Sequence, residues 1–183
     1  MKGALIALVL VLIVLTAISG VISRDYNQLA TERHDIEARW VQLDKDMKER
    51  ADLTAKLLRP VHQYSPQEKA LLEEIERDRA ALLAAKEKRE EMEANNRLSA
   101  ALSRLLAPQD HLSRLASNQT LQDDLADAEQ NIANDRSDYN EAIKKYNTDR
   151  LLFPQNVTAA LFHFERDDAY FLTPGEENKP PQS

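Results

Sequence analysis

The chain has 183 residues, 30% of them charged, and a formal net charge of −7. Such an acidic chain lacks the basic face that a general nucleic-acid-binding protein needs, so we expect no nucleic-acid partner. It has only 3 glycines and 5% aromatic residues and is rich in Ala, Leu, Glu and Lys, a composition that favours long helices. Cysteine is absent, which allows either side of a membrane, because a helical domain of this size needs no disulfides.

Residues 3–23 carry no charge, and this run of about twenty mostly apolar residues matches the hydrocarbon thickness of a bilayer. A cleavable signal peptide is the alternative, since Lys2 resembles a short basic start and residues 17–19 resemble a small-residue cleavage site. The apolar cores of signal peptides span about 7–15 residues, whereas this run continues to Ile22. We therefore predict a retained transmembrane anchor at residues 1–23.

The orientation of this anchor depends on the positive charges at its two ends. Lys2 lies on one side, while Arg24, Arg33 and Arg39 lie on the other, so the charges nearest the membrane are almost balanced. The signal-like start favours an N-terminus in the cytoplasm, with the following domain on the extracytoplasmic side.

The first segment after the anchor is predicted to be a long helix. Its stripe follows steps of three and four residues from Tyr26 through Trp40 to Arg50, the spacing of a seam between helices that pack at a shallow angle. Pro60 ends or kinks this helix. Arg50 interrupts the stripe, either at its edge with the charge in solvent or paired with buried acids or carbonyls.

Two further long helices are predicted. Ser65 and Glu68 form a capping box, and residues 67–107 contain no Gly or Pro, which predicts one helix of about forty residues. Its charge-rich stretch 84–93 is expected to be a solvated face. An apolar stripe from Leu121 to Tyr146 predicts the third long helix.

The predicted fold class is all-α: an N-terminal transmembrane helix, then an antiparallel bundle of three long helices plus a short C-terminal helix. The short helix is expected at residues 157–164, with Asn156 as its cap. The bundle domain is placed at residues 24–172. Residues 173–183, rich in Pro and Glu, are expected to be disordered.

Four blocks of aromatic and amide residues stand out in the chain. They are Tyr26-Asn27-Gln28-Leu29 with Trp40, Arg50 and Asp52; Ala94-Asn95-Asn96-Arg97 through Leu106; Tyr139-Asn140 with Tyr146-Asn147; and Phe153-Pro154-Gln155-Asn156 with Tyr170-Phe171. In this order they resemble the LemA family of bacterial membrane proteins. The connector departs from the family, since residues 109–112 read Gln-Asp-His-Leu where Tyr-Pro-Asp-Leu is usual. The resemblance implies a membrane helix, a mainly helical antiparallel domain and a single-pass location in the bacterial cytoplasmic membrane.

No catalytic or metal-binding motif is recognisable in the sequence. The histidines are scattered, at His34, His62, His111 and His163, and do not repeat at a metal-ligand interval. Zinc patterns, phosphate loops and nucleophile elbows are absent, and the acids between Glu73 and Asp78 lack the Glu-x-x-His partners of a bundle metal site. We therefore expect no enzymatic activity, no cofactor and no metal.

The pairs Tyr139-Asn140 and Tyr146-Asn147 repeat after seven residues and so lie on one helix face. They form either a recognition surface or part of the core, with the tyrosine hydroxyls bonded to partners such as Arg50 or Asp52. The second interpretation is favoured because both tyrosines continue the apolar stripe. The candidate structural or interaction positions are Tyr26, Trp40, Arg50, Asp52, Asn95, Asn96, Tyr139, Asn140, Tyr146 and Asn147.

These features favour a non-enzymatic, membrane-anchored scaffold or tether whose partners are other membrane or envelope proteins. Self-association is compatible with the sequence, although only residues 19–23 approach a small-residue packing pattern. The alternative is a ligand or peptide sensor, or a cryptic hydrolase, that uses a pocket between helices near Tyr139 and Arg50.

Overall fold

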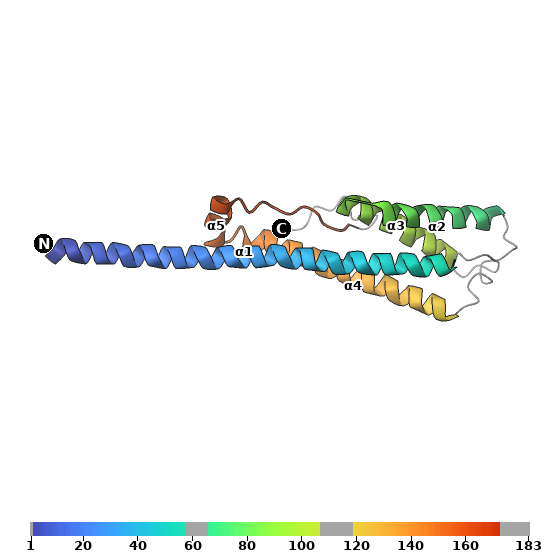
Figure 1. Ribbon diagram of the computed structural model, residues 1–183, viewed down its shortest axis with the longest axis horizontal. Helices are drawn as coiled ribbons and strands as arrows, with labels where there is room; N and C mark the ends of the chain where they lie inside the picture. The colour runs from blue at the N-terminus through green and yellow to red at the C-terminus, as the bar shows by residue number, and fades with distance from the viewer. Residues whose placement is uncertain (1, 58–65, 107–118, 173–183) are drawn as a thin grey trace. The chain divides into compact units, whose positions relative to one another are not determined.

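The structure is a computed structural model that describes residues 2–57, 66–106 and 119–172 (Figure 1). The helices are α1 (Lys2–Leu57), α2 (Pro66–Ala84), α3 (Lys88–Leu106), α4 (Gln119–Asp149) and α5 (Gln155–Phe162). No strand occurs within the described ranges, which confirms the predicted all-α class for that part of the chain. The expected cap Ser65 and the expected disordered tail at 173–183 lie outside the described residues.

Helix α1 begins with the apolar segment and has 56 residues. Its most apolar stretch of 18 residues has a mean hydropathy of 3.1, and none of that stretch is buried against the rest of the chain. By length and composition α1 is therefore a candidate membrane anchor. The helix continues without a break through residues 20–30, so the apolar segment runs directly into the predicted seam.

The chain divides into two compact units. Unit 1 comprises Met1–Ala38 and Glu141–Asp168, and unit 2 comprises Arg39–Asn140 and Ala169–Ser183. Both α1 and α4 contribute residues to each unit, whereas α5 belongs to unit 1 and α2 and α3 belong to unit 2.

The prediction of one helix over residues 67–107 is wrong, because α2 ends at Ala84 and α3 begins at Lys88. The two helices lie side by side as a hairpin (Figure 1). This arrangement buries apolar groups on both helices, including Ile75 and Leu98, which a single straight helix would not bring together. At the turn, the carboxylate of Glu90 accepts a hydrogen bond from the Lys86 amide at 3.4 Å, and a negative charge there favours the N-terminus of α3.

Apolar side chains at the predicted spacing form the core of unit 2. They include Leu43 and Met47 from α1, Ile75 and Leu82 from α2, Leu98, Ala101 and Leu105 from α3, and Leu125, Ile132 and Tyr139 from α4. Complete burial of each large side chain contributes about 1.5–3 kcal/mol. The stripes on α1 and α4 therefore account for their packing, as predicted.

The core of unit 1 contains Leu29 and Ile36 from α1, Ile143 and Tyr146 from α4, and Phe164 beyond α5. Helix α5 starts two residues earlier than predicted and follows Pro154, and no side chain caps it. Asn156 therefore lies inside α5 and is not its cap. The helix ends at Phe162 and is followed by His163, whose left-handed conformation (φ 56°) lets the Phe164 amide donate to the Ala159 carbonyl at 3.0 Å.

Candidate functional site

The ten positions singled out by the sequence are distributed over both units. Tyr26, Tyr146 and Asn147 belong to unit 1, and the other seven belong to unit 2. Within the units they form separate clusters, each of which has its own physical role.

The most deeply buried polar cluster in unit 2 surrounds Arg50, whose side chain has no exposed surface. Its guanidinium donates to Asn95 Oδ1 at 2.7 Å and to Ser99 Oγ at 2.5 Å, and it forms an ion pair with Glu129. Ser99 Oγ donates in turn to Glu129 Oε1 at 3.1 Å. Of the two alternatives predicted for Arg50, the structure has the one in which its charge is paired inside the protein. This one charged group links α1, α3 and α4.

Burial lowers the pKa of Arg50, and the carboxylate of Glu129 opposes this shift. The opposing charge matters because an unpaired buried cation is very costly in free energy. Sequence reasoning missed Glu129, which looks like one of many acids on the polar face of α4. Asp52, predicted as a hydroxyl partner, is exposed. Glu76 raises the pKa of Arg79, and the charge of Asp52 makes a smaller contribution in the same direction.

A tilted aromatic contact joins α1 to α4 in unit 2. The rings of Trp40 and Tyr139 are 5.5 Å apart between centroids, and Lys88 Nζ lies 5.3 Å from the first ring and 5.9 Å from the second. A cation at this distance is attracted to the ring face. The stretch 84–93 is consequently not a solvated face throughout, since Glu91 and Met92 are also buried.

Asn140 and Asn96 hold the main chain of the C-terminal segment in unit 2. Asn140 Nδ2 donates to the Phe171 carbonyl at 2.9 Å, and its Oδ1 accepts from the Phe171 amide at 2.8 Å. Asn96 Nδ2 donates to the Leu172 carbonyl at 2.9 Å. Phe171 is 1% exposed. The segment is therefore fixed by one buried side chain and by hydrogen bonds from asparagine side chains to its main chain, an arrangement that we call a clamp.

Asn147 repeats the same clamp within unit 1. Its Nδ2 donates to the Asp167 carbonyl at 2.6 Å, and its Oδ1 accepts from the Asp167 amide at 3.0 Å. The Tyr146 hydroxyl donates to the Glu165 carbonyl at 2.7 Å, so its partner is neither Arg50 nor Asp52. Burial is the main cause that raises the pKa of Tyr146.

Tyr26 lies beside the end of α5 in unit 1. Its ring makes edge contacts with Phe162 and Phe164, at centroid distances of 5.0 Å and 5.4 Å. Tyr26 remains 42% exposed, unlike Tyr139 and Tyr146. These contacts join α1, just after its apolar segment, to the chain around α5.

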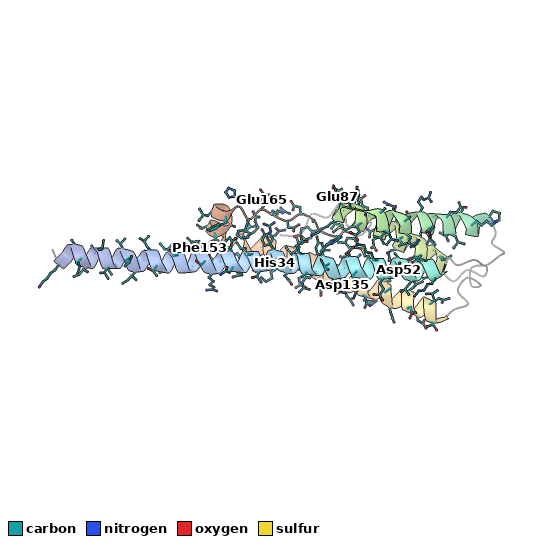
Figure 2. All side chains as sticks on the ribbon, in the orientation of Figure 1. His34, Asp52, Glu87, Asp135, Phe153 and Glu165 are labelled. Carbon is teal, nitrogen blue, oxygen red and sulfur yellow. The ribbon has the colours of Figure 1, made fainter. Side chains whose placement is uncertain are left out.

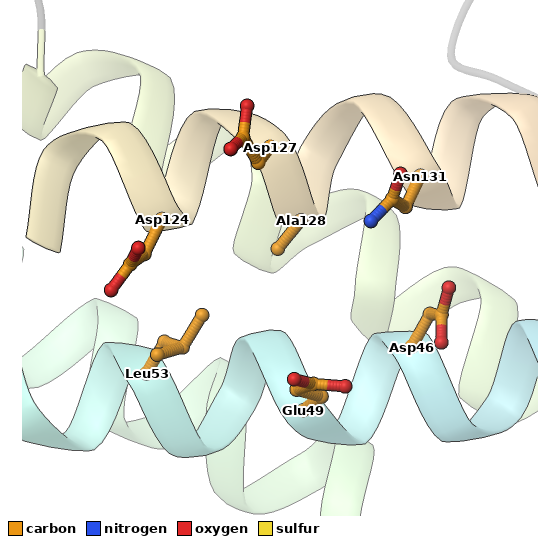
Figure 3. Close-up of a pocket in the computed structure, with 7 residues that line it drawn as sticks. All are labelled: Asp46, Glu49, Leu53, Asp124, Asp127, Ala128 and Asn131. Atoms are coloured by element: carbon orange, nitrogen blue, oxygen red, sulfur yellow. The ribbon is translucent and has the colours of Figure 1, made fainter.

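A cleft of about 310 Å³ lies between α1 and α4 in unit 2 (Figure 3). It is lined by Asp46, Glu49 and Leu53 from α1 and by Asp124, Asp127, Ala128 and Asn131 from α4. Its four carboxylates give it a negative potential that favours a cationic occupant. Neither Arg50 nor Tyr139, near which a pocket was predicted, is among these lining residues.

Two acids meet a lysine where α1 packs on α3. Lys48 Nζ lies 2.5 Å from Asp44 Oδ1 and 3.8 Å from Glu91 Oε1. Burial raises the pKa of Glu91 to about 8, the nearby Asp44 adds to the increase, and Lys48 opposes it. Among the described residues, no group of three or more His, Asp or Glu side chains is placed to hold a metal ion.

Over residues 2–57, 66–106 and 119–172, the helices, the internal polar clusters and the exposed apolar start of α1 define a helical protein with one candidate membrane anchor. The family profile of the LemA family matches residues 39–182, which is more than half of the chain. The chain therefore belongs to the LemA family, and the resemblance drawn from the four sequence blocks is confirmed. A comparison with curated proteins found no match.

Proposed function

We propose that this LemA family protein is a non-enzymatic, membrane-anchored helical bundle that acts as a scaffold or tether for other proteins of the cell envelope. The observation that carries the proposal is α1, in which a segment with mean hydropathy 3.1 continues unbroken into a buried seam that includes Leu29 and Ile36. A domain joined to a bilayer in this way is kept next to other membrane proteins, which raises their effective concentration for binding.

The polar clusters support a structural and binding role more than catalysis. Arg50, Asn140 and Asn147 direct their hydrogen bonds to other groups of the same chain. The residues that line the cleft are four acids, an amide and two apolar side chains, without the Ser–His or Ser–Lys pair of a nucleophilic hydrolase. The sensor alternative would use this acidic cleft, with a cationic ligand.

Exposed apolar side chains on unit 2 are the natural places to look for partners. Val41 on α1 is 64% exposed and Leu83 on α2 is 42% exposed. A photo-crosslinking amino acid at either position, in cells that express the full chain, should give discrete crosslinked species with other membrane proteins. The same probe at Ala126, an exposed position in an acidic part of α4, is the matched control.

Two outcomes of this experiment would contradict a tether. The first is that the probes at Val41 and Leu83, like the control probe at Ala126, give only the uncrosslinked monomer. The second is crosslinking only to a further copy of the chain, which would indicate a self-associating protein without other partners.

For the topology, we propose an N-terminus in the cytoplasm and a domain on the extracytoplasmic side of the bacterial cytoplasmic membrane. The support is the signal-like start at Lys2 followed by the apolar segment. Alkaline phosphatase fused to the C-terminus should be active in whole cells. If the phosphatase fusion is inactive, and a C-terminal fusion to a reporter that requires the cytoplasm is active, the orientation is the opposite of the one proposed.

A further inference from the structure

Unit 1 carries an uncharged, exposed apolar surface around α5 that neither the clusters above nor the proposed tether explains. Residues 151–162 contain no charged side chain in a chain of which 30% is charged. Six of them are large and exposed: Leu151 (67%), Leu152 (52%), Phe153 (83%), Val157 (53%), Leu161 (58%) and Phe162 (46%). We call these six residues the α5 patch. Contiguous exposed apolar residues of this kind mark a surface that is covered by something else.

The level of the α5 patch relative to the apolar segment of α1 indicates what covers the patch. The apolar segment up to Ile22 measures about 30 Å, the thickness of the hydrocarbon core. Tyr26 lies four residues further along the same helix, about 6 Å beyond the hydrocarbon and hence at the level of the lipid headgroups. Phe162 packs against Tyr26 at 5.0 Å, which places the end of α5 at that level.

The local chemistry matches an interfacial location. Trp and Tyr concentrate where hydrocarbon meets headgroups, and Phe and Leu form the apolar face of interfacial helices. Here Tyr26, Phe153 and Phe162 belong to one unit. In the view of Figure 2, Phe153 lies nearer the apolar end of α1 than His34 does. The charged end of Arg150, which precedes the patch, donates from Nε to the Phe164 carbonyl at 3.2 Å and so turns inward to the chain.

We propose that the α5 patch inserts into the interfacial region of the same bilayer that holds α1, as a second, monotopic contact with lipid. A lipid surface suits this patch because the patch and the exposed apolar segment of α1 belong to the same unit, and Phe162 packs on Tyr26 just beyond that segment. A partially buried apolar helix of this kind reaches about 5–10 Å into the boundary between headgroups and acyl chains. This inference rests on the membrane anchor of the proposed function.

Fluorescence quenching in liposomes tests the inference with the full chain. Because the sequence has no cysteine, single substitutions allow specific labelling with the fluorophore NBD. Phe153→Cys and Leu161→Cys report on the patch, and His34→Cys is the aqueous control, an exposed position on α1 two turns beyond Tyr26. Leu12→Cys reports on the anchor. The labelled proteins are reconstituted at low density in phosphatidylcholine vesicles, with and without nitroxide-bearing lipids.

We expect aqueous iodide to quench the labels at Phe153 and Leu161 about threefold less than the label at His34, because lipid shields them. Nitroxide lipids should quench both patch labels and the Leu12 label, but not the His34 label. If Leu12 is quenched by nitroxide lipids while Phe153 and Leu161 respond to iodide as strongly as His34, the inference is wrong and the anchor stands. If Leu12 is not quenched either, the anchor itself is wrong. Protection from iodide without quenching by nitroxide lipids would show that protein covers the patch, which also contradicts the inference.

Discussion

Asn140 binds both main-chain polar groups of Phe171, and so one side chain satisfies a donor and an acceptor that belong to no helix or strand. The substitution Asn140→Leu removes both hydrogen bonds. We expect a loss of about 1–3 kcal/mol in the free energy of unfolding and faster proteolysis around residues 169–172. Urea unfolding and limited proteolysis measure the two effects.

The control for this prediction is Asn134→Leu, on the same helix. Asn134 is exposed and accepts one hydrogen bond, from Gln130 at 3.0 Å, so its replacement should change stability by less than about 0.5 kcal/mol. Equal proteolysis of the Asn140→Leu and Asn134→Leu variants would show that the clamp does not hold the segment.

The second prediction concerns the buried charge of Arg50. Arg50→Ala breaks the ion pair to Glu129 and removes the hydrogen bonds to Asn95 and Ser99, and we expect it to reduce the free energy of unfolding by about 3–5 kcal/mol. Arg50→Lys should recover only part of this loss, because an ammonium group cannot reproduce the planar fork of the guanidinium. Chemical denaturation monitored by the single tryptophan, Trp40, measures these differences.

The comparison variant is Arg89→Ala, which removes an ion pair to Glu93 at 3.2 Å from a side chain that is 89% exposed. Exposed pairs contribute about 0–1 kcal/mol, so this variant should be almost as stable as the wild type. A loss at Arg50 no larger than that at Arg89 would mean that the buried cluster does not stabilise unit 2.

The third prediction concerns the hydroxyl of Tyr146. Tyr146→Phe keeps the ring and removes the hydrogen bond to the Glu165 carbonyl, and it should reduce stability by about 0.5–1.5 kcal/mol. Tyr26→Phe is the matched change at a half-exposed ring in the same unit and should have a smaller effect. Thermal unfolding of both variants checks this, and an unchanged Tm for Tyr146→Phe would rule out a stabilising hydroxyl.

The fourth prediction is a pH dependence at Glu91. Its folded pKa of about 8 lies above the ordinary value of 4.5, so the folded state holds this proton more tightly than the unfolded chain. The resulting stability is full below about pH 4.5 and is lost as the pH rises through about 8. Glu91→Gln should therefore flatten the decline of Tm between these pH values, whereas Glu93→Gln, at an exposed site, should not. If the wild type and Glu91→Gln show the same dependence of Tm on pH, the raised pKa of Glu91 is contradicted.

Periodicity predicted the parts of the fold that depend on one helix at a time. The stripe from Tyr26 to Arg50 and the stripe ending at Tyr146 both describe faces that are largely buried. The turn between Ala84 and Lys88 was missed because it contains no Gly or Pro, and only the packing of α2 on α3 favours it.

The partners of the candidate residues were harder to predict than the residues themselves. The Tyr-Asn repeat on α4 was recognised, but Asn140 and Asn147 bind main-chain groups of Phe171 and Asp167, and main-chain groups carry no sequence signal. Glu129 was missed because an acid on a helix surface is common, and only the fold brings it to Arg50.

The intact mass of the protein extracted from membranes tests the retained anchor, the central claim, most directly. We predict the full 20.8 kDa chain in the membrane fraction, resistant to extraction by alkaline carbonate. A shorter chain that begins after the small residues at 17–19 and is released by carbonate would contradict the anchor, since it would identify the apolar segment as a cleaved signal.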